Sequence, residues 1–174
     1  METKQIHVPY GLITGIAMVI VGVTMYLTGL VFVKGMNLIA YLPLLIGVIL
    51  NAFAYSKAND GYVTFGNIFW SCFRMSMIVT IILVAWGVIS LFVFPEMKEK
   101  TIEYARQEMA KNPKMTDEAM EMGLNWMRKS WNVMMVAGSV FAGLFYGAIF
   151  SLIGSAIAPK KGERPINIAD TFSS

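Results

Sequence analysis

Two polar side chains inside long apolar stretches have the most evident chemistry of any residues in this 174-residue chain. Arg74 is the one charged residue within these stretches, and Asn51 carries an amide within another. A charge inside a membrane-spanning segment marks a candidate functional site by default. The guanidinium of Arg74 cannot lose its proton, so it has to be solvated, paired or held by hydrogen-bond acceptors.

Three environments are open to Arg74. Because its long side chain can extend to the lipid headgroups, we expect it at the cytoplasmic interface, near Asp60 or a lipid phosphate. A hydrogen bond to Asn51 and a role in substrate binding are the alternatives. Asn51 itself is expected to make an interhelical hydrogen bond, which is the usual role of an amide in lipid.

Other residue types that could react or bind a metal are sparse. Cys72 is the single cysteine, so no disulfide can form within the chain, and the ligands for a zinc site are lacking. His7 is the single histidine, and we expect it to be solvated. The fourteen methionines are dispersed, which favours packing over copper(I) ligation. We predict no catalytic residue, no cofactor, no metal and no enzymatic activity.

Four apolar runs are long enough to cross a bilayer. They cover residues 10–33, 38–55, 68–94 and 131–158. Only 14% of all residues are charged, against about 25% in soluble domains. No run alternates polar and apolar residues as a half-buried strand does. The sequence therefore predicts an all-α membrane protein, in which residues 1–158 form one domain with four transmembrane helices.

Small residues recur at fixed intervals in the first and fourth runs. The first has glycines seven apart, and the fourth has small residues four apart: Gly15, Gly22 and Gly29, and Ser139, Gly143, Gly147 and Ser151. On a helix each set lies along one face. Such a face lets another backbone approach closely, which is a main source of helix affinity in lipid. We predict that the first and fourth spans pack together through these faces, with a homo-oligomer contact as the alternative.

A polar insert, residues 95–130, separates the third and fourth runs. Its first half has helical propensity, Pro113 breaks that helix, and Thr116 is placed to cap a second one. We predict an extramembrane helical hairpin. Its second helix should continue into the fourth span, from about Asp117 to about Ile157.

The distribution of basic residues indicates the orientation, since lysine and arginine in short loops favour the cytoplasm. Four spans place Lys57 and the basic residues of the C-terminal tail on the same side as the N-terminus. The insert is also rich in basic residues, so we rely on the first run, interpreted as a retained signal anchor, and on the tail. We expect both termini in the cytoplasm, the insert outside, and residues 159–174 to form a disordered cytoplasmic tail.

Three features of the chain resemble a known family. A polar turn and the sequence GYVTFGNIF (61–69) open the third run, a charged helical insert follows it, and FYGAIFSLIGSAIAPKK (145–161) closes the fourth. Together they resemble an uncharacterised family of small four-span inner-membrane proteins of Bacteroidota, known only as a domain of unknown function. The resemblance implies the bacterial cytoplasmic membrane and supplies no catalytic residue, cofactor or substrate.

The abundance of packing signals and the lack of reactive groups favour a non-enzymatic structural or accessory subunit. Its partners would be the lipid bilayer and either a second copy of the chain or another membrane protein. The net charge of +3 is too small to indicate nucleic acid. The alternative is a small oligomeric transporter or channel, in which Arg74 and Asn51 line a path for an anion or a lipid headgroup.

Overall fold

The computed structural model describes residues 5–163, and all regular elements within them are helices. The α-helices are α1 His7–Leu27, α2 Leu42–Ala58, α3 Phe65–Val93, α4 Met97–Ala110 and α5 Asp117–Ile157, and two short 3-10 helices, Leu30–Phe32 and Met36–Tyr41, join α1 to α2. Four helical segments, which contain α1, α2, α3 and α5, are long and apolar enough to cross a membrane. The prediction of an all-α chain with four candidate spans is confirmed. Residues 164–174, most of the tail predicted to be disordered, lie outside the described residues.

The first span is shorter than predicted. α1 ends at Leu27 rather than at residue 33, because Gly29 adopts a left-handed conformation with φ of 73° that the helix cannot continue through. No heavy atom lies within 4 Å of the position that a Cβ on Gly29 would take. Gly29 is therefore a turn residue in this structure, not part of a helix contact.

Two threonines fix where the later helices begin. Thr64 precedes α3 and forms a capping box with Asn67. The Thr64 hydroxyl accepts a hydrogen bond from the backbone N–H of Asn67 at 3.3 Å, and the backbone N–H of Thr64 donates to the side-chain oxygen of Asn67 at 3.1 Å. Thr116 precedes α5, and its hydroxyl accepts from the amide of Ala119 at 3.3 Å. The predicted cap at Thr116, and the single helix from Asp117 to Ile157, are confirmed.

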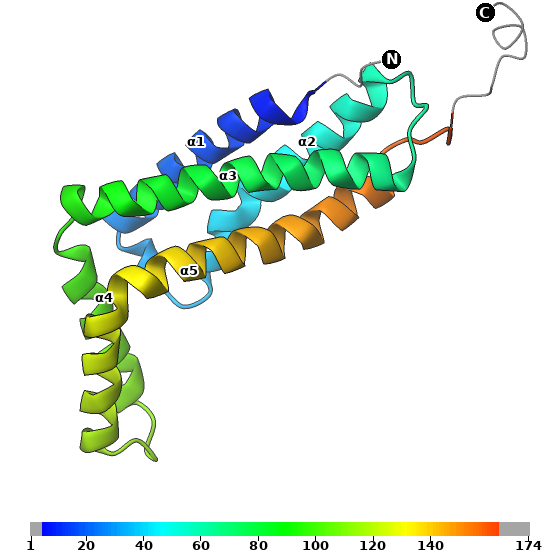
Figure 1. Cartoon of the computed structure of the whole chain (residues 1–174). Coiled ribbons are helices and arrows are strands. Elements are labelled where there is room, and N and C mark those ends of the chain that lie inside the picture. The colour runs from blue at the N-terminus through cyan, green and yellow to red at the C-terminus, as the bar shows by residue number, and fades with distance from the viewer. Residues whose placement is uncertain (1–4, 164–174) are drawn as a thin grey trace, which may run out of the picture.

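α3 is the central helix of the bundle, because α1, α2 and α5 all pack against it (Figure 1). α1 and α5 also contact α2, but they make no extensive contact with each other. The predicted pairing of the first and fourth spans is therefore wrong. Gly15 of α1, and Gly143 and Gly147 of α5, pack on α3 instead.

The contact between α3 and α5 depends on two glycines of α5. A Cβ on Gly143 would lie 2.2 Å from the hydroxyl oxygen of Thr80, and one on Gly147 would lie 2.7 Å from the Cβ of Ser76. Both distances are below any ordinary contact, so the two backbones approach this closely only because neither glycine has a side chain.

α1 packs on the other side of α3 in a similar way. A Cβ on Gly15 would lie 2.5 Å from Cδ1 of Ile82 and 3.2 Å from its Cβ. Gly22, seven residues further along α1, is exposed and has no heavy atom within 4 Å of its would-be Cβ. The α1–α3 contact therefore includes Gly15 and leaves Gly22 on the outer surface.

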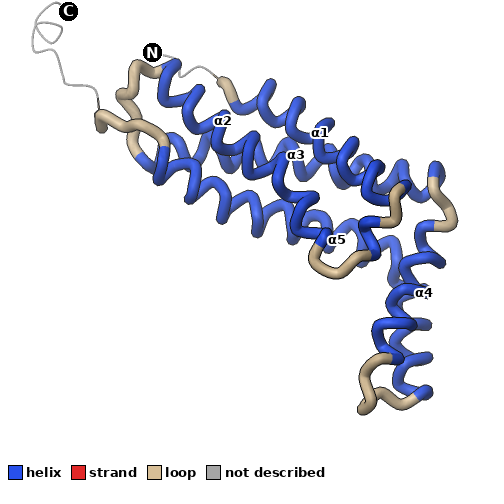
Figure 2. Tube along the Cα trace, turned by 180° about the vertical axis from the view of Figure 1, so that it is seen from behind, coloured by secondary structure: helices blue, strands red, loops and turns tan. Residues whose placement is uncertain are grey.

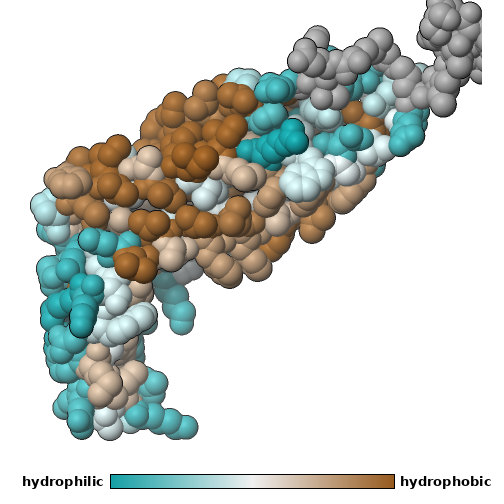
Figure 3. Space-filling model, viewed as in Figure 1, coloured by the Kyte–Doolittle hydropathy of each residue, from teal (hydrophilic) through white to brown (hydrophobic). Residues whose placement is uncertain are grey.

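α4 and the first turns of α5 lie side by side and run across the direction of the bundle (Figures 1 and 2). Ile102 and Leu124 are buried between them. Arg106 of α4 forms an ion pair with Glu121 of α5, with 2.8 Å between nitrogen and oxygen. The surface over these two helices is largely hydrophilic, whereas the bundle surface is largely hydrophobic (Figure 3).

A polar contact joins α4 to the end of α1. The Tyr26 hydroxyl donates to the carboxylate of Glu96, just before α4, at 2.9 Å. The backbone N–H of Glu96 itself and the Tyr26 hydroxyl hold the pKa of this carboxyl below its ordinary value. The start of α4 is therefore tied to the bundle by a side chain as well as by the short connection from α3.

Candidate functional site

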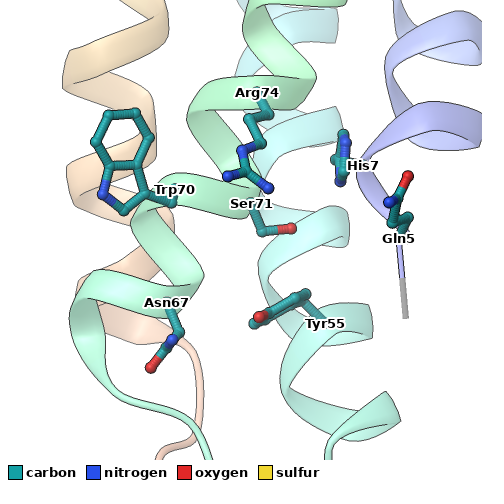
Figure 4. Close-up of a pocket in the computed structure, with 7 residues that line it drawn as sticks. All are labelled: Gln5, His7, Tyr55, Asn67, Trp70, Ser71 and Arg74. Carbon is teal, nitrogen blue, oxygen red and sulfur yellow. The ribbon is translucent and has the colours of Figure 1, made fainter. Parts of the chain in front are cut away.

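A cavity of about 310 Å³ opens where α1 begins, α2 ends and α3 begins (Figure 4). Its lining residues are mostly polar: Gln5, His7, Tyr55, Asn67, Trp70, Ser71 and Arg74. The cavity contains the one charged residue of the apolar runs and no acidic side chain.

The helical repeat of α3 brings four of these residues to the cavity. Asn67, Trp70, Ser71 and Arg74 are spaced by three or four residues and so share one face. The capping box at Thr64 fixes the first turn of α3 and thereby the position of Asn67. His7, in the first turn of α1, and Tyr55, near the end of α2, supply the facing walls.

Arg74 is exposed, and its guanidinium points back toward the start of α3, beside Ser71 (Figure 4). This is the direction in which side chains lean on a helix. None of the ion pairs found among residues 5–163 includes Arg74. Within the part of the chain that the structure describes, the guanidinium therefore faces the cavity as a cation with no carboxylate bound to it.

Asn51 is fully buried and does not line the cavity. Its amide nitrogen donates to the hydroxyl of Ser71 at 3.2 Å and lies 3.4 Å from the sulfur of Cys72. The expected interhelical hydrogen bond is therefore present between α2 and α3, with Ser71 as the partner. The alternative in which Asn51 binds Arg74 directly is wrong.

Asp60 lies in the turn between α2 and α3, in a left-handed conformation with φ of 55°. It lines a different recess, together with Lys57 and Lys161. The structure thus places Asp60 and Arg74 in separate hollows at the same end of the bundle.

Five of the residues that line the cavity with Arg74 were not predicted as site residues: Asn67, Trp70, Ser71, His7 and Tyr55. The spacing of Asn67, Trp70 and Ser71 relative to Arg74 is a signal that a helical projection of α3 would have revealed. His7 and Tyr55 give no such signal, because only the packing of α1 and α2 against α3 brings them to Arg74.

Cys72 is completely buried, and its sulfur lies 3.6 Å from the carbonyl oxygen of Val48 in α2. It therefore serves as a small packing residue between α2 and α3. Within residues 5–163, no group of three or more histidine, cysteine, aspartate or glutamate side chains is placed to hold a metal.

An all-helical fold with four apolar helices of spanning length is that of a multi-pass membrane protein. The model of a family described as "Protein of unknown function (DUF4199)" matches residues 9–160, and the chain belongs to this family. The expected membership of a domain-of-unknown-function family is confirmed. No curated protein and no solved structure matches the chain.

Proposed function

We propose that the chain is a non-enzymatic accessory subunit of the bacterial cytoplasmic membrane, which associates with itself or with another membrane protein. The observation that carries the proposal is the use of the hydroxyl groups in the spans. Ser76 donates to the carbonyl of Cys72 at 3.1 Å, and Thr80 donates to that of Ser76 at 2.8 Å. Both side chains are buried where Gly143 and Gly147 approach α3, so these hydroxyls support close helix packing.

Two glycines on the outer surface support an association in the membrane. Gly22 of α1 and Gly138 of α5 are both exposed, with no heavy atom within 4 Å of their would-be Cβ atoms. A glycine costs helical stability, and an outward-facing one gives a second helix a flat surface in lipid. The pair α4 and early α5, which we propose to be an extramembrane hairpin, offers a further polar contact surface.

The association can be tested on protein reconstituted in lipid nanodiscs. We expect a particle that contains more than one copy of the 19.3 kDa chain or a co-purified membrane protein, and Gly22→Leu together with Gly138→Leu should reduce that association. Proteoliposomes should release trapped phosphate or chloride no faster than protein-free liposomes loaded with the same anion. A strictly monomeric particle that conducts either anion would contradict the proposal and favour the transporter alternative.

Basic residues support a placement with both termini in the cytoplasm. Lys57 and Lys161 lie at the bundle end where α1 begins, and the ammonium of Lys160 donates to three carbonyls at the end of α5, the shortest to Ser155 at 2.7 Å. This arrangement puts positive charge at the proposed cytoplasmic face and supports a placement of the proposed hairpin on the opposite side.

The placement predicts opposite labelling of two introduced cysteines. In a Cys72→Ala background, an impermeant maleimide added to intact cells should label Lys111→Cys in the hairpin and leave Lys161→Cys unlabelled until the cells are opened. Both positions are exposed, so access to the reagent depends only on the side of the membrane. Labelling of Lys161→Cys alone in intact cells would show that the topology is the inverse of the one proposed.

A further inference from the structure

We propose that the cavity beside Arg74 binds a phosphate group, supplied either by an anionic lipid headgroup or by free phosphate. The guanidinium carries five donors in a planar fork that matches phosphate oxygens. It faces the cavity (Figure 4), none of the ion pairs among residues 5–163 includes it, and none of the residues that line the cavity is acidic. A cation in such a recess is stabilised by a bound anion.

The remaining lining groups add neutral donors around the cation. Asn67 and Gln5 carry amide N–H groups and Tyr55 a hydroxyl. Ser71 accepts a hydrogen bond from Asn51, which leaves its own O–H available to donate into the cavity. The buried Asn51 thereby orients Ser71 for an acceptor on the ligand, although it does not touch the cavity itself.

The size and position of the cavity also suit a phosphate. A volume of about 310 Å³ holds several groups the size of a water molecule, each about 30 Å³, so a phosphate fits with room for part of a headgroup. Trp70, at the rim, is 56% exposed, as is common for tryptophan at a membrane–water interface. The lipid source rests on the bilayer placement proposed above, whereas binding of free phosphate does not depend on it.

Two substitutions in α3 should remove the electrostatic attraction of the cavity for a phosphate without disturbing the helix. Arg74→Gln removes the charge from an exposed position. Asn67→Asp is isosteric, retains the acceptor that bonds to Thr64 in the capping box, and adds a negative charge to the cavity. Arg128→Gln is the matched control, because Arg128 lies on the hairpin and pairs with Glu99.

The test measures binding to the full-length protein in detergent. Native mass spectrometry records retention of phosphatidylglycerol relative to diacylglycerol, which lacks the phosphate, and calorimetry records inorganic phosphate relative to chloride. We expect Arg74→Gln and Asn67→Asp each to weaken binding about tenfold, Arg74→Lys to weaken it less, and Arg128→Gln to leave it unchanged. Melting curves check that each variant is folded.

The two arms separate the sources of the phosphate. Retention of phosphatidylglycerol without binding of inorganic phosphate identifies a lipid headgroup, and the reverse identifies free phosphate while leaving the association proposed above untouched. Equal binding of both probes by folded wild type, Arg74→Gln and Asn67→Asp would overturn the phosphate site. It would do so without bearing on the oligomeric state or the topology.

Discussion

Gly143→Leu should destabilise the bundle by on the order of 3 kcal/mol, because there is no space for a side chain between α5 and α3. Even a Cβ at this position would lie 2.2 Å from the hydroxyl of Thr80 and 3.0 Å from its Cβ. Thr80 is held by its hydrogen bond to the carbonyl of Ser76. The substitution therefore forces the two helices apart along their main contact.

The matched control lies on the same helix. Gly138→Leu adds the same side chain at an exposed position with nothing within 4 Å, so the monomer in detergent should keep its melting temperature. Gly143→Leu should lower it by roughly 5–10 °C. Equal melting temperatures for the two variants would show that α5 does not pack on α3 through Gly143.

Gly15→Leu should destabilise the contact between α1 and α3, by about 2 kcal/mol. The cost is smaller than at Gly143 because the nearest atom, Cδ1 of Ile82, is the end of a flexible side chain. The Cβ of Ile82, at 3.2 Å, cannot move without shifting α3. Only part of the overlap can therefore be relieved by a change of rotamer.

Gly22 provides the control for this substitution, since it occupies the same helix seven residues on and faces open space. Gly22→Leu should leave the melting temperature of the detergent-solubilised monomer unchanged. If Gly22→Leu lowered the melting temperature as much as Gly15→Leu, the two glycines would form one continuous packing face, as the sequence predicted.

The positions of the helices could be predicted from the sequence far better than the choice of helix against which each one packs. The limits of α5 follow from local signals, namely the cap at Thr116 and the apolar run that ends before Pro159. Partner choice has no such signal, because a glycine face indicates that something approaches closely without indicating what. The prediction that the first and fourth spans pack together was wrong for this reason.

A complementary signal was present in α3. Cys72, Ser76 and Thr80 are small residues four apart, the same interval as Gly143 and Gly147 of α5. Matching intervals on two helices predict that their surfaces can interdigitate, a signal that the small residues of the first and fourth runs alone do not give. The cavity is harder to predict, because His7 and Tyr55 reach Arg74 only through the tertiary packing.

α5 runs from its contact with α4 into its contact with α3 without a loop, so the number of residues between the two contacts sets the direction in which α4 lies around α5. Each residue of a helix turns the chain by about 100°. On one part of α5, Gly123 faces Met109 of α4, and further along Gly143 faces Thr80 of α3. One residue added between these glycines would swing α4 by about 100° around the axis of α5 and strain the link from Tyr26 to Glu96. Seven residues would restore its direction to within about 20° but would move α4 about 10 Å further along α5, so the length of this stretch is set by the rise of the helix as well as by its rotation.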